Sequence, residues 1–189
     1  AVAGSFFPAS QAELEAELVK LFRDALPISL EGTVQSLIVP HAGYAYSGLV
    51  AASAYKSIPE DAAYSNVFII ATSHREQYNG ASVYNTGNYI TPLGQVRVNK
   101  NIANALISEN KNISFHKQAH EREHSIEVQL PFIQHRLGDI PIVPILMGSS
   151  TVAAARDLAA ALIPYYTPDN LFIISSDFSH YPSYKDAQR

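Results

Sequence analysis

The sequence contains no cysteine. This absence excludes disulfide bonds, thiolate zinc sites, iron–sulfur clusters and cysteine nucleophiles, and it leaves histidine and carboxylate side chains as the strong metal ligands. It is also typical of a cytoplasmic protein, which is the location that we expect. No apolar run approaches the ~20 residues that a membrane-spanning helix needs, and the first residues do not form a secretory signal. We therefore expect no membrane association.

Positive charge is scarce as well. The chain has 13 Lys and Arg residues against 17 Asp and Glu residues, which gives a net charge of −4, and its basic residues form no cluster. Such a protein repels nucleic acids and anionic lipids, so we expect no nucleic-acid partner. The length of 189 residues and the hydrophobic fraction of 47% are ordinary for a globular protein and predict a single domain over residues 1–189.

Strand-like and helix-like segments follow each other along the chain. Short, unbroken apolar runs predict buried strands at residues 36–40, 67–72, 140–147 and 171–174. Apolar periodicity predicts helices, with Ser10 and Thr151 as N-caps, over residues 11–26, 42–58, 101–109, 127–137 and 151–163. Residues 79–98 mix Tyr, Thr and Val with Gly and Pro, as in a β-hairpin. This order predicts an α/β fold with a mainly parallel or mixed central sheet and helices on both faces.

Three of the predicted strands end at histidine. His41 follows the run SLIVP, His74 follows FIIATS, and FIISS leads into Asp177 and His180. A lone histidine after a strand is more often a capping or core residue than a ligand. Because the carboxyl ends of parallel strands meet at one edge of a sheet, however, we expect these side chains to share a pocket. Two imidazoles with oxygen donors and open positions form the ligand set of non-haem Fe(II) sites, and the set also suits Zn or Cu.

A competing pattern lies at residues 120–124. The sequence His120-Glu121-Arg122-Glu123-His124 fits two short zinc-protease patterns, and a helix would place its two histidines on the same face. The alternative interpretation is an exposed, charged turn that leads into an amphipathic helix. We expect the turn, with no metal shared by His120 and His124, and we keep a zinc metalloprotease as the less favoured alternative.

Six blocks spread along the whole chain together resemble the Memo family. They are AVAGSFFP, IVPHAGYAYSG, ATSH, EREHSIEVQLPF, IVPILMG and SSDFSHY. The fold of that family is similar to that of the class III extradiol ring-cleaving dioxygenases, so the resemblance implies the same α/β fold. It also implies that the metal ligands are His41 and His74, with Fe(II) as the first expectation and Cu or Zn as alternatives.

The resemblance implies roles for further side chains of the pocket. His180 matches the acid–base histidine of the dioxygenase relatives, and Asp177 is expected to orient it. Three residues match positions that line the pocket and are expected to bind substrate: Tyr46, His124 and Glu127. Family members continue beyond SSDFSHY, and the following residues supply a further ligand, a Cys in Memo. We therefore expect residues 1–189 to lack the C-terminal part of the family fold and to bind metal weakly or be empty.

Two classes of function stay open. The first is a non-haem metal oxidoreductase of the dioxygenase type, acting on a small aromatic molecule. The second is a binding or adaptor module that uses the same pocket to recognise a peptide or a protein, because fold does not determine function. Bound iron with turnover would favour the first class, and a metal-free pocket that binds phenol-like side chains would favour the second.

Overall fold

A mixed sheet of six strands forms the centre of the protein. The computed structural model describes residues 2–26 and 32–188. The strand order is β1-β8-β2-β7-β3-β6, with the bounds β1 Ser36–Val39, β2 Asn66–Thr72, β3 Ala81–Val83, β6 Ile113–Ser114, β7 Ile142–Met147 and β8 Asn170–Ser175. All neighbouring pairs are parallel except β3 and β7. The predicted α/β fold with a mainly parallel or mixed sheet is confirmed.

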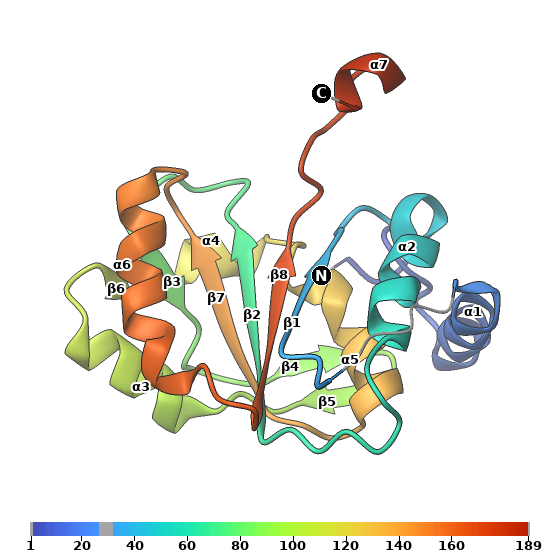
Figure 1. Ribbon diagram of the computed structural model, residues 1–189, viewed down its shortest axis with the longest axis horizontal. Coiled ribbons are helices and arrows are strands. Elements are labelled where there is room, and N and C mark those ends of the chain that lie inside the picture. The colour runs from blue at the N-terminus through green and yellow to red at the C-terminus, as the bar shows by residue number, and fades with distance from the viewer. Residues whose placement is uncertain (1, 27–31, 189) are drawn as a thin grey trace.

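Helices cover both faces of this sheet (Figure 1). Helices α1 (Gln11–Asp24), α2 (Tyr44–Lys56) and α5 (Leu130–Leu137) lie on one face, and α3 (Lys100–Glu109) and α6 (Val152–Leu162) lie on the other. Successive side chains of a strand point to opposite faces. Val67 and Ile69 of β2 therefore enter the core under α1, α2 and α5, whereas Phe68 enters the core under α3 and α6. This two-sided burial explains the unbroken apolar run of β2.

Capping residues set where the predicted helices begin. The Ser10 side chain accepts the backbone N–H of Glu13 at 3.3 Å, and that of Thr151 accepts the backbone N–H of Ala154 at 3.2 Å. Both predicted N-caps are confirmed. Pro131 lies in the first turn of α5, where its missing N–H costs nothing. The helix predicted over 127–137 is therefore a 3₁₀ turn, η1 (Glu127–Gln129), followed by α5.

The smaller elements lie around the edges of the sheet. Strands β4 (Tyr89–Thr91) and β5 (Gly94–Val96) form a separate antiparallel hairpin inside the predicted segment 79–98, while β3 from the same segment joins the central sheet. The remaining helices are α4 (Lys117–Glu121), η2 (Ile163–Tyr165) and α7 (Tyr184–Ala187), and α7 stands away from the body (Figure 1). None of the helices in the described ranges is long and apolar enough to cross a membrane.

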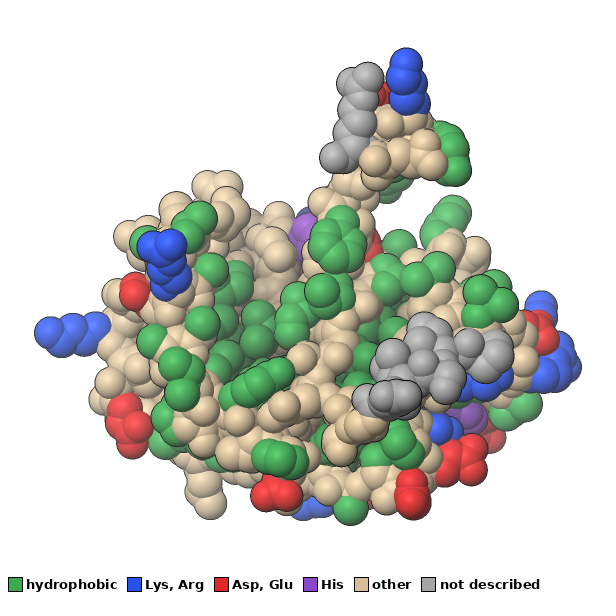
Figure 2. Space-filling view, in the orientation of Figure 1, with side chains coloured by type: hydrophobic (Ala, Val, Ile, Leu, Met, Phe, Trp, Pro, Cys, Tyr) green, Lys and Arg blue, Asp and Glu red, His purple; other side chains and the backbone are tan. Residues whose placement is uncertain are grey.

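The sheet face that carries α3 and α6 is left partly open near the edge strand β1. Burial alternates along this strand, and Ile38 is 55% exposed. Beside it, a cavity of about 400 Å³ is lined by five side chains: Ala159, Leu162, Ile163, Tyr166 and Phe172. Figure 2 shows apolar side chains at the surface between α6 and α2. Strand β1 is therefore covered on one face only, unlike β2.

The close approach of β3 to β6 depends on Gly80. Its φ is +80°, and a Cβ there would lie 2.0 Å from the carbonyl oxygen of Asn112. We expect Gly80→Ala to lower the free energy of unfolding by about 2–4 kcal/mol, because positive-φ strain and overpacking each cost roughly 1–3 kcal/mol. Urea denaturation measures the loss. Gly94→Ala is the control, since Gly94 also has a positive φ but no atom within 4 Å. Equal losses in both variants would contradict the role of the close contact.

Candidate metal centre

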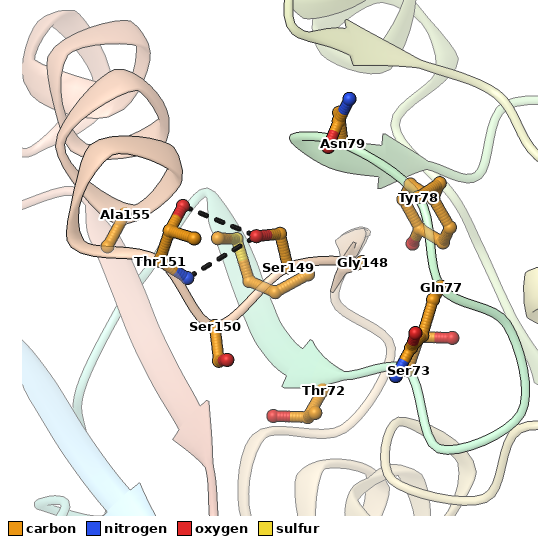
Figure 3. A pocket seen from close by; sticks show the side chains of 11 residues that line it. Thr72, Ser73, Gln77, Tyr78, Asn79, Gly148, Ser149, Ser150, Thr151 and Ala155 are labelled. Carbon is orange, nitrogen blue, oxygen red and sulfur yellow. Dashed lines mark hydrogen bonds between the residues drawn. The ribbon is translucent and has the colours of Figure 1, made fainter.

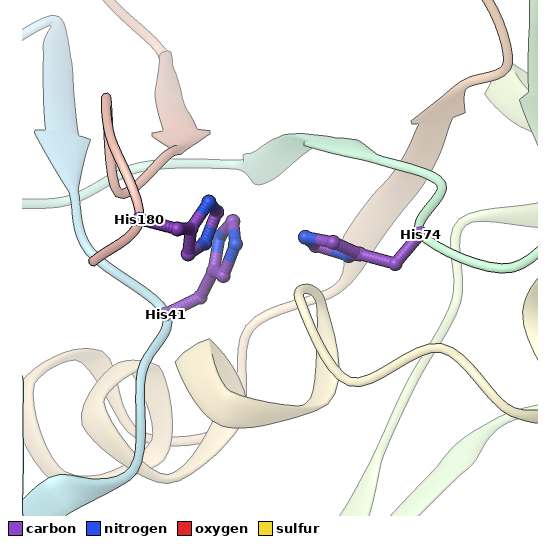
Figure 4. Close-up of side chains that lie close together, drawn as sticks. All are labelled: His41, His74 and His180. Carbon is purple, nitrogen blue, oxygen red and sulfur yellow. The ribbon is translucent and has the colours of Figure 1, made fainter. Parts of the chain in front are cut away.

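Three histidines meet beyond the carboxyl ends of β1, β2 and β8, which are neighbours in the sheet. The ring centroids of His41 and His74 are 5.1 Å apart, and His180 lies 6.4 Å and 6.1 Å from them. One ring nitrogen from each residue lies within 4.8 Å of the other two. Figure 4 shows the three rings gathered at this edge, and Figure 2 shows histidine surface at the base of the C-terminal segment. The structure thus brings together the histidines that the strand ends predicted.

A buried hydrogen-bond chain determines which nitrogen of His41 carries the proton. The Ser175 hydroxyl donates its only proton to the carbonyl oxygen of Ser125 at 2.7 Å. The same hydroxyl accepts the side-chain N–H of Gln129 at 2.9 Å and lies 3.0 Å from Nδ1 of His41. With its proton already used, Ser175 can only accept from His41, so Nδ1 is the protonated nitrogen. Nε2 of His41 therefore carries a free lone pair.

The Gln129 amide that supports this assignment has a fixed orientation. Its nitrogen donates to the carbonyl oxygen of Pro40 at 2.9 Å, and its oxygen accepts the Tyr55 hydroxyl at 3.0 Å. A reversed amide would place two oxygens against each other at Pro40. The donor and the acceptor are therefore assigned for every hydrogen bond that links Tyr55, Gln129, Ser175 and His41.

The free lone pair of His41 fits a metal ion. Nε2 is buried and has no hydrogen-bond partner among the described residues, and a buried acceptor without a partner is costly unless something binds it. Burial also lowers the pKa of His41 to about 4, although Asp177 opposes this shift. The ring is therefore neutral at pH 7, which is the form that binds metals.

Glu123 holds the second imidazole of the centre. Its Oε1 lies 2.9 Å from Nδ1 of His74, and its Oε2 accepts the backbone N–H of His74 at 2.7 Å. Burial raises the pKa of Glu123, but hydrogen bonds from His74 and Ser125 lower it by more, so the pKa lies below its ordinary value. The carboxyl group is therefore ionised and can only accept. His74 must donate from Nδ1, which leaves its Nε2 free as well.

Asp177 connects the third imidazole with the first. Its Oδ2 lies 3.0 Å from Nε2 of His180, and its Oδ1 accepts the backbone N–H of His41 at 2.6 Å. The same Oδ2 is 3.7 Å from Nε2 of His41. The carboxylate thus fixes the ring of His180 beside the free lone pair of His41, in the way that outer carboxylates orient metal-site histidines.

The three residues predicted to bind substrate lie in different environments. The ring of His124 is 5.6 Å from that of His41 and 4.6 Å from that of His74, so it adjoins the centre. Tyr46 lies in the first turn of α2 and is 89% exposed. Glu127 is buried and accepts the backbone N–H of Val2 at 2.9 Å. The described contacts thus place His124 against the histidine cluster, and substrate-binding roles for Tyr46 and Glu127 stay predictions.

The prediction of an exposed turn at residues 120–124 is wrong in part. Helix α4 ends at Glu121, so His120 and His124 do not lie on one helix as the zinc-protease pattern requires. Nε2 of His120 lies 2.9 Å from the Ser82 hydroxyl, whereas His124 adjoins His74. Glu123 is buried instead of solvated, because its carboxylate accepts several N–H groups. The paired zinc site of the metalloprotease alternative is not formed.

The neutral state of His120 should make the metal-free protein less stable at acid pH. Burial lowers the pKa of His120 from 6.5 to about 4. The unfolded chain therefore takes up a proton near pH 6.5 that the folded chain refuses until about pH 4, so this contribution is complete above pH 6.5 and is lost as the pH falls. One such group changes the free energy of unfolding by at most ~1.4 kcal/mol per pH unit. In urea titrations between pH 7 and pH 4.5, His120→Gln should show a flatter decline than the unmodified protein, and an unchanged decline would contradict the assignment.

A polar cavity adjoins the segment that carries His74. Its volume is about 770 Å³, and its walls are the segment after β2 and the segment between β7 and α6 (Figure 3). Among the uncharged residues that line it are Thr72, Ser73, Gln77, Asn79, Ser149 and Thr151. The volume is in the range of small-molecule sites. A ligand in this cavity would contact the residues on both sides of His74 in the sequence.

Comparisons with known proteins show which family the chain resembles along its whole length. The family model described as "Memo-like protein" matches residues 1–188. A "MEMO1 family protein" of Methanobrevibacter smithii is 37% identical over 201 residues, covering 100% of this chain and 71% of the relative. A similarly named protein of Thermoplasma acidophilum is 39% identical over 191 residues, covering 100% of this chain and 68% of its own length. One from Thermotoga sp. (strain RQ2) is 36% identical over 200 residues, with 100% and 72% covered.

Proposed function

We propose that this chain, which belongs to the Memo-like protein family, binds one redox-active metal ion at His41 and His74. In this proposal the protein serves as an oxidoreductase of the dioxygenase type. Fe(II) is the first expectation, and Cu is the alternative. The observation that carries the proposal is the buried, unpartnered Nε2 of His41 within a cluster of histidine rings. Two imidazoles that are hydrogen-bonded at Nδ1 and leave Nε2 for the metal suit either ion.

The residues around the two ligands would handle protons and substrate. Nε2–H of His180 donates to Asp177, so Nδ1 remains available to accept a proton. Its side chain is 54% exposed and can exchange protons with solvent. We assign proton transfer to His180 and its orientation to Asp177. When bound, the metal would supply one-electron chemistry and open coordination positions.

The substrate would enter the polar cavity beside His74. Its lining offers hydroxyl and amide groups without charge, which suits an uncharged molecule that carries hydroxyl groups. A small aromatic molecule with phenolic hydroxyls is therefore the proposed substrate class, and His124 lies close enough to the cluster to contact it. The cytoplasmic location expected from the sequence stays a prediction.

Anaerobic titration with Fe(II), followed by exposure to catechol and oxygen, tests the proposal. We expect one ion per chain and catechol-dependent oxygen uptake. Two imidazoles form only part of a coordination sphere, so the titration must reach concentrations at which weak binding is visible. A protein that binds neither Fe(II) nor Cu would overturn the metal proposal. A metal-free pocket that binds phenol or a tyrosine-containing peptide would instead favour the adaptor module.

A further inference from the structure

Glu123 lies at the junction of two imidazoles. Its side chain is 1% exposed, and the residue lies two positions after the end of α4. Nδ1 of His74 is 2.9 Å from Oε1, and Nδ1 of His124 is 3.2 Å from the same oxygen. One buried carboxylate therefore contacts the same ring position in both histidines.

Backbone groups hold this carboxylate in place. Oε1 accepts the N–H groups of His124 at 2.9 Å and Ser125 at 3.0 Å, and Oε2 accepts the N–H of His74 at 2.7 Å. Both loops that carry the histidines are thus anchored to the same side chain. Movement of Glu123 would displace the loop after β2 and the loop after α4 together.

We propose that Glu123 is a positioning residue that keeps His74 in the tautomer protonated at Nδ1, so that Nε2 of His74 stays free to bind a ligand of the centre. Both oxygens of the carboxylate already accept backbone N–H groups, so the ring satisfies the 2.9 Å contact by donating. Ser175 performs the corresponding task for His41 with a hydroxyl whose proton is already used.

Glu123 is better placed to orient the rings than to bind a metal itself. A metal could in principle be held by His74, Glu123 and His124, whose ligand atoms lie within 4.8 Å of one another. A carboxylate has about four lone-pair positions, and Oε1 and Oε2 already accept from three backbone N–H groups and the ring of His74. An ion bound there would have to displace these donors.

Glu123→Leu tests the proposal, because leucine is close to glutamate in size and offers no hydrogen-bond acceptor. Glu123→Gln would not test it, because an amide turned with its oxygen at the position of Oε1 still accepts from Nδ1 of His74. Without an acceptor, nothing holds the proton of His74 at Nδ1, and the ring can carry it at Nε2 instead. The matched control is Glu121→Leu, since Glu121 is exposed and pairs with Lys117 at 3.3 Å.

Nitrogen NMR of the metal-free protein, labelled in its histidines, reads the tautomer directly. The resonances of His74 are assigned by their loss in His74→Gln. We expect His74 to be protonated at Nδ1 in the unmodified protein and in Glu121→Leu, and to shift toward the Nε2-protonated form in Glu123→Leu. An Nε2-protonated His74 in the unmodified protein would overturn the proposal, as would an unchanged tautomer in a folded Glu123→Leu. If that variant does not fold, Glu123→Asp, which keeps the acceptor, should retain the Nδ1-protonated form, and an altered tautomer there would count against the proposal.

The consequence for metal affinity rests on the proposed function and is measured separately. Loss of an outer partner of a ligating histidine typically weakens metal binding roughly 10–100-fold, and we expect a loss in this range for Zn²⁺ binding by Glu123→Leu and none for Glu121→Leu. If the unmodified protein binds no metal, the metal proposal fails while the tautomer result still stands. If metal binds tightly but the tautomer is unchanged, the role of Glu123 fails and the metal centre remains.

Discussion

Replacing both His41 and His74 with alanine should abolish detectable Fe(II) binding. The two imidazoles supply the nitrogen ligands of the proposed centre, and both have a free Nε2 that is fixed by a hydrogen bond at Nδ1. Their removal should cost more than the roughly 10–100-fold that loss of an outer partner causes. Anaerobic titration, with bound and free metal separated by filtration, measures the change. Zn²⁺ binding should be lost in the same double variant, since Zn²⁺ accepts the same ligands.

His135→Ala is the control for general effects of histidine removal. His135 lies in α5, where its ring packs 4.6 Å from that of Phe22, on a different part of the molecule from the sheet edge. This variant should bind metal as the unmodified protein does. A His41→Ala, His74→Ala protein that retained normal affinity would remove both residues from the site and with them the proposed centre.

Ser175→Ala should weaken both the fold and the metal site. The hydroxyl accepts from His41 and Gln129 and donates to the carbonyl oxygen of Ser125, all within 3.0 Å, and Ser175 is 2% exposed. Each buried partner left unsatisfied costs about 1–3 kcal/mol, and with partial relaxation we expect the free energy of unfolding to fall by roughly 3 kcal/mol. His41 also loses the acceptor that fixes its tautomer, so metal affinity should fall roughly 10–100-fold.

The neighbouring Ser176 provides a matched control for this variant. Its hydroxyl accepts the backbone N–H of Phe178 at 3.1 Å in an exposed part of the chain. Ser176→Ala should therefore stay within about 0.5 kcal/mol of the unmodified protein in urea denaturation, as surface substitutions usually do. If Ser175→Ala were equally mild and bound metal normally, the hydrogen-bond chain would not determine the state of His41.

The placement of the three histidines could be predicted because strand ends in a parallel sheet converge. Each of His41, His74 and His180 follows an apolar run, and the runs proved to be the adjacent strands β1, β2 and β8. The neighbour order itself was not predictable. An apolar composition indicates that a strand is buried, but it does not indicate its neighbours. The pairing of β8 with β1 and β2 depends on the packing of the whole chain.

The partners that fix the imidazoles could not be predicted from the sequence. The contact of Glu123 with His74 spans 49 residues, and that of Ser175 with His41 spans 134. No local pattern marks such pairs. In the sequence, Glu123 stood out only as part of a zinc-protease pattern. That interpretation failed because α4 ends at Glu121, so that His120 contacts Ser82 whereas His124 adjoins His74. Ser175 carries a weaker signal, as a polar residue that ends an apolar strand.

Location of the metal by anomalous diffraction tests the central claim most directly. Crystals grown without oxygen would be soaked in Fe(II), and data collected on either side of the iron absorption edge. We predict one strong iron peak within coordination distance of Nε2 of His41 and Nε2 of His74, with Nδ1 of each ring still hydrogen-bonded to Ser175 and Glu123. A peak at His120, or one bound only by Glu123 and His124 with Nε2 of His41 left without a ligand, would contradict the account.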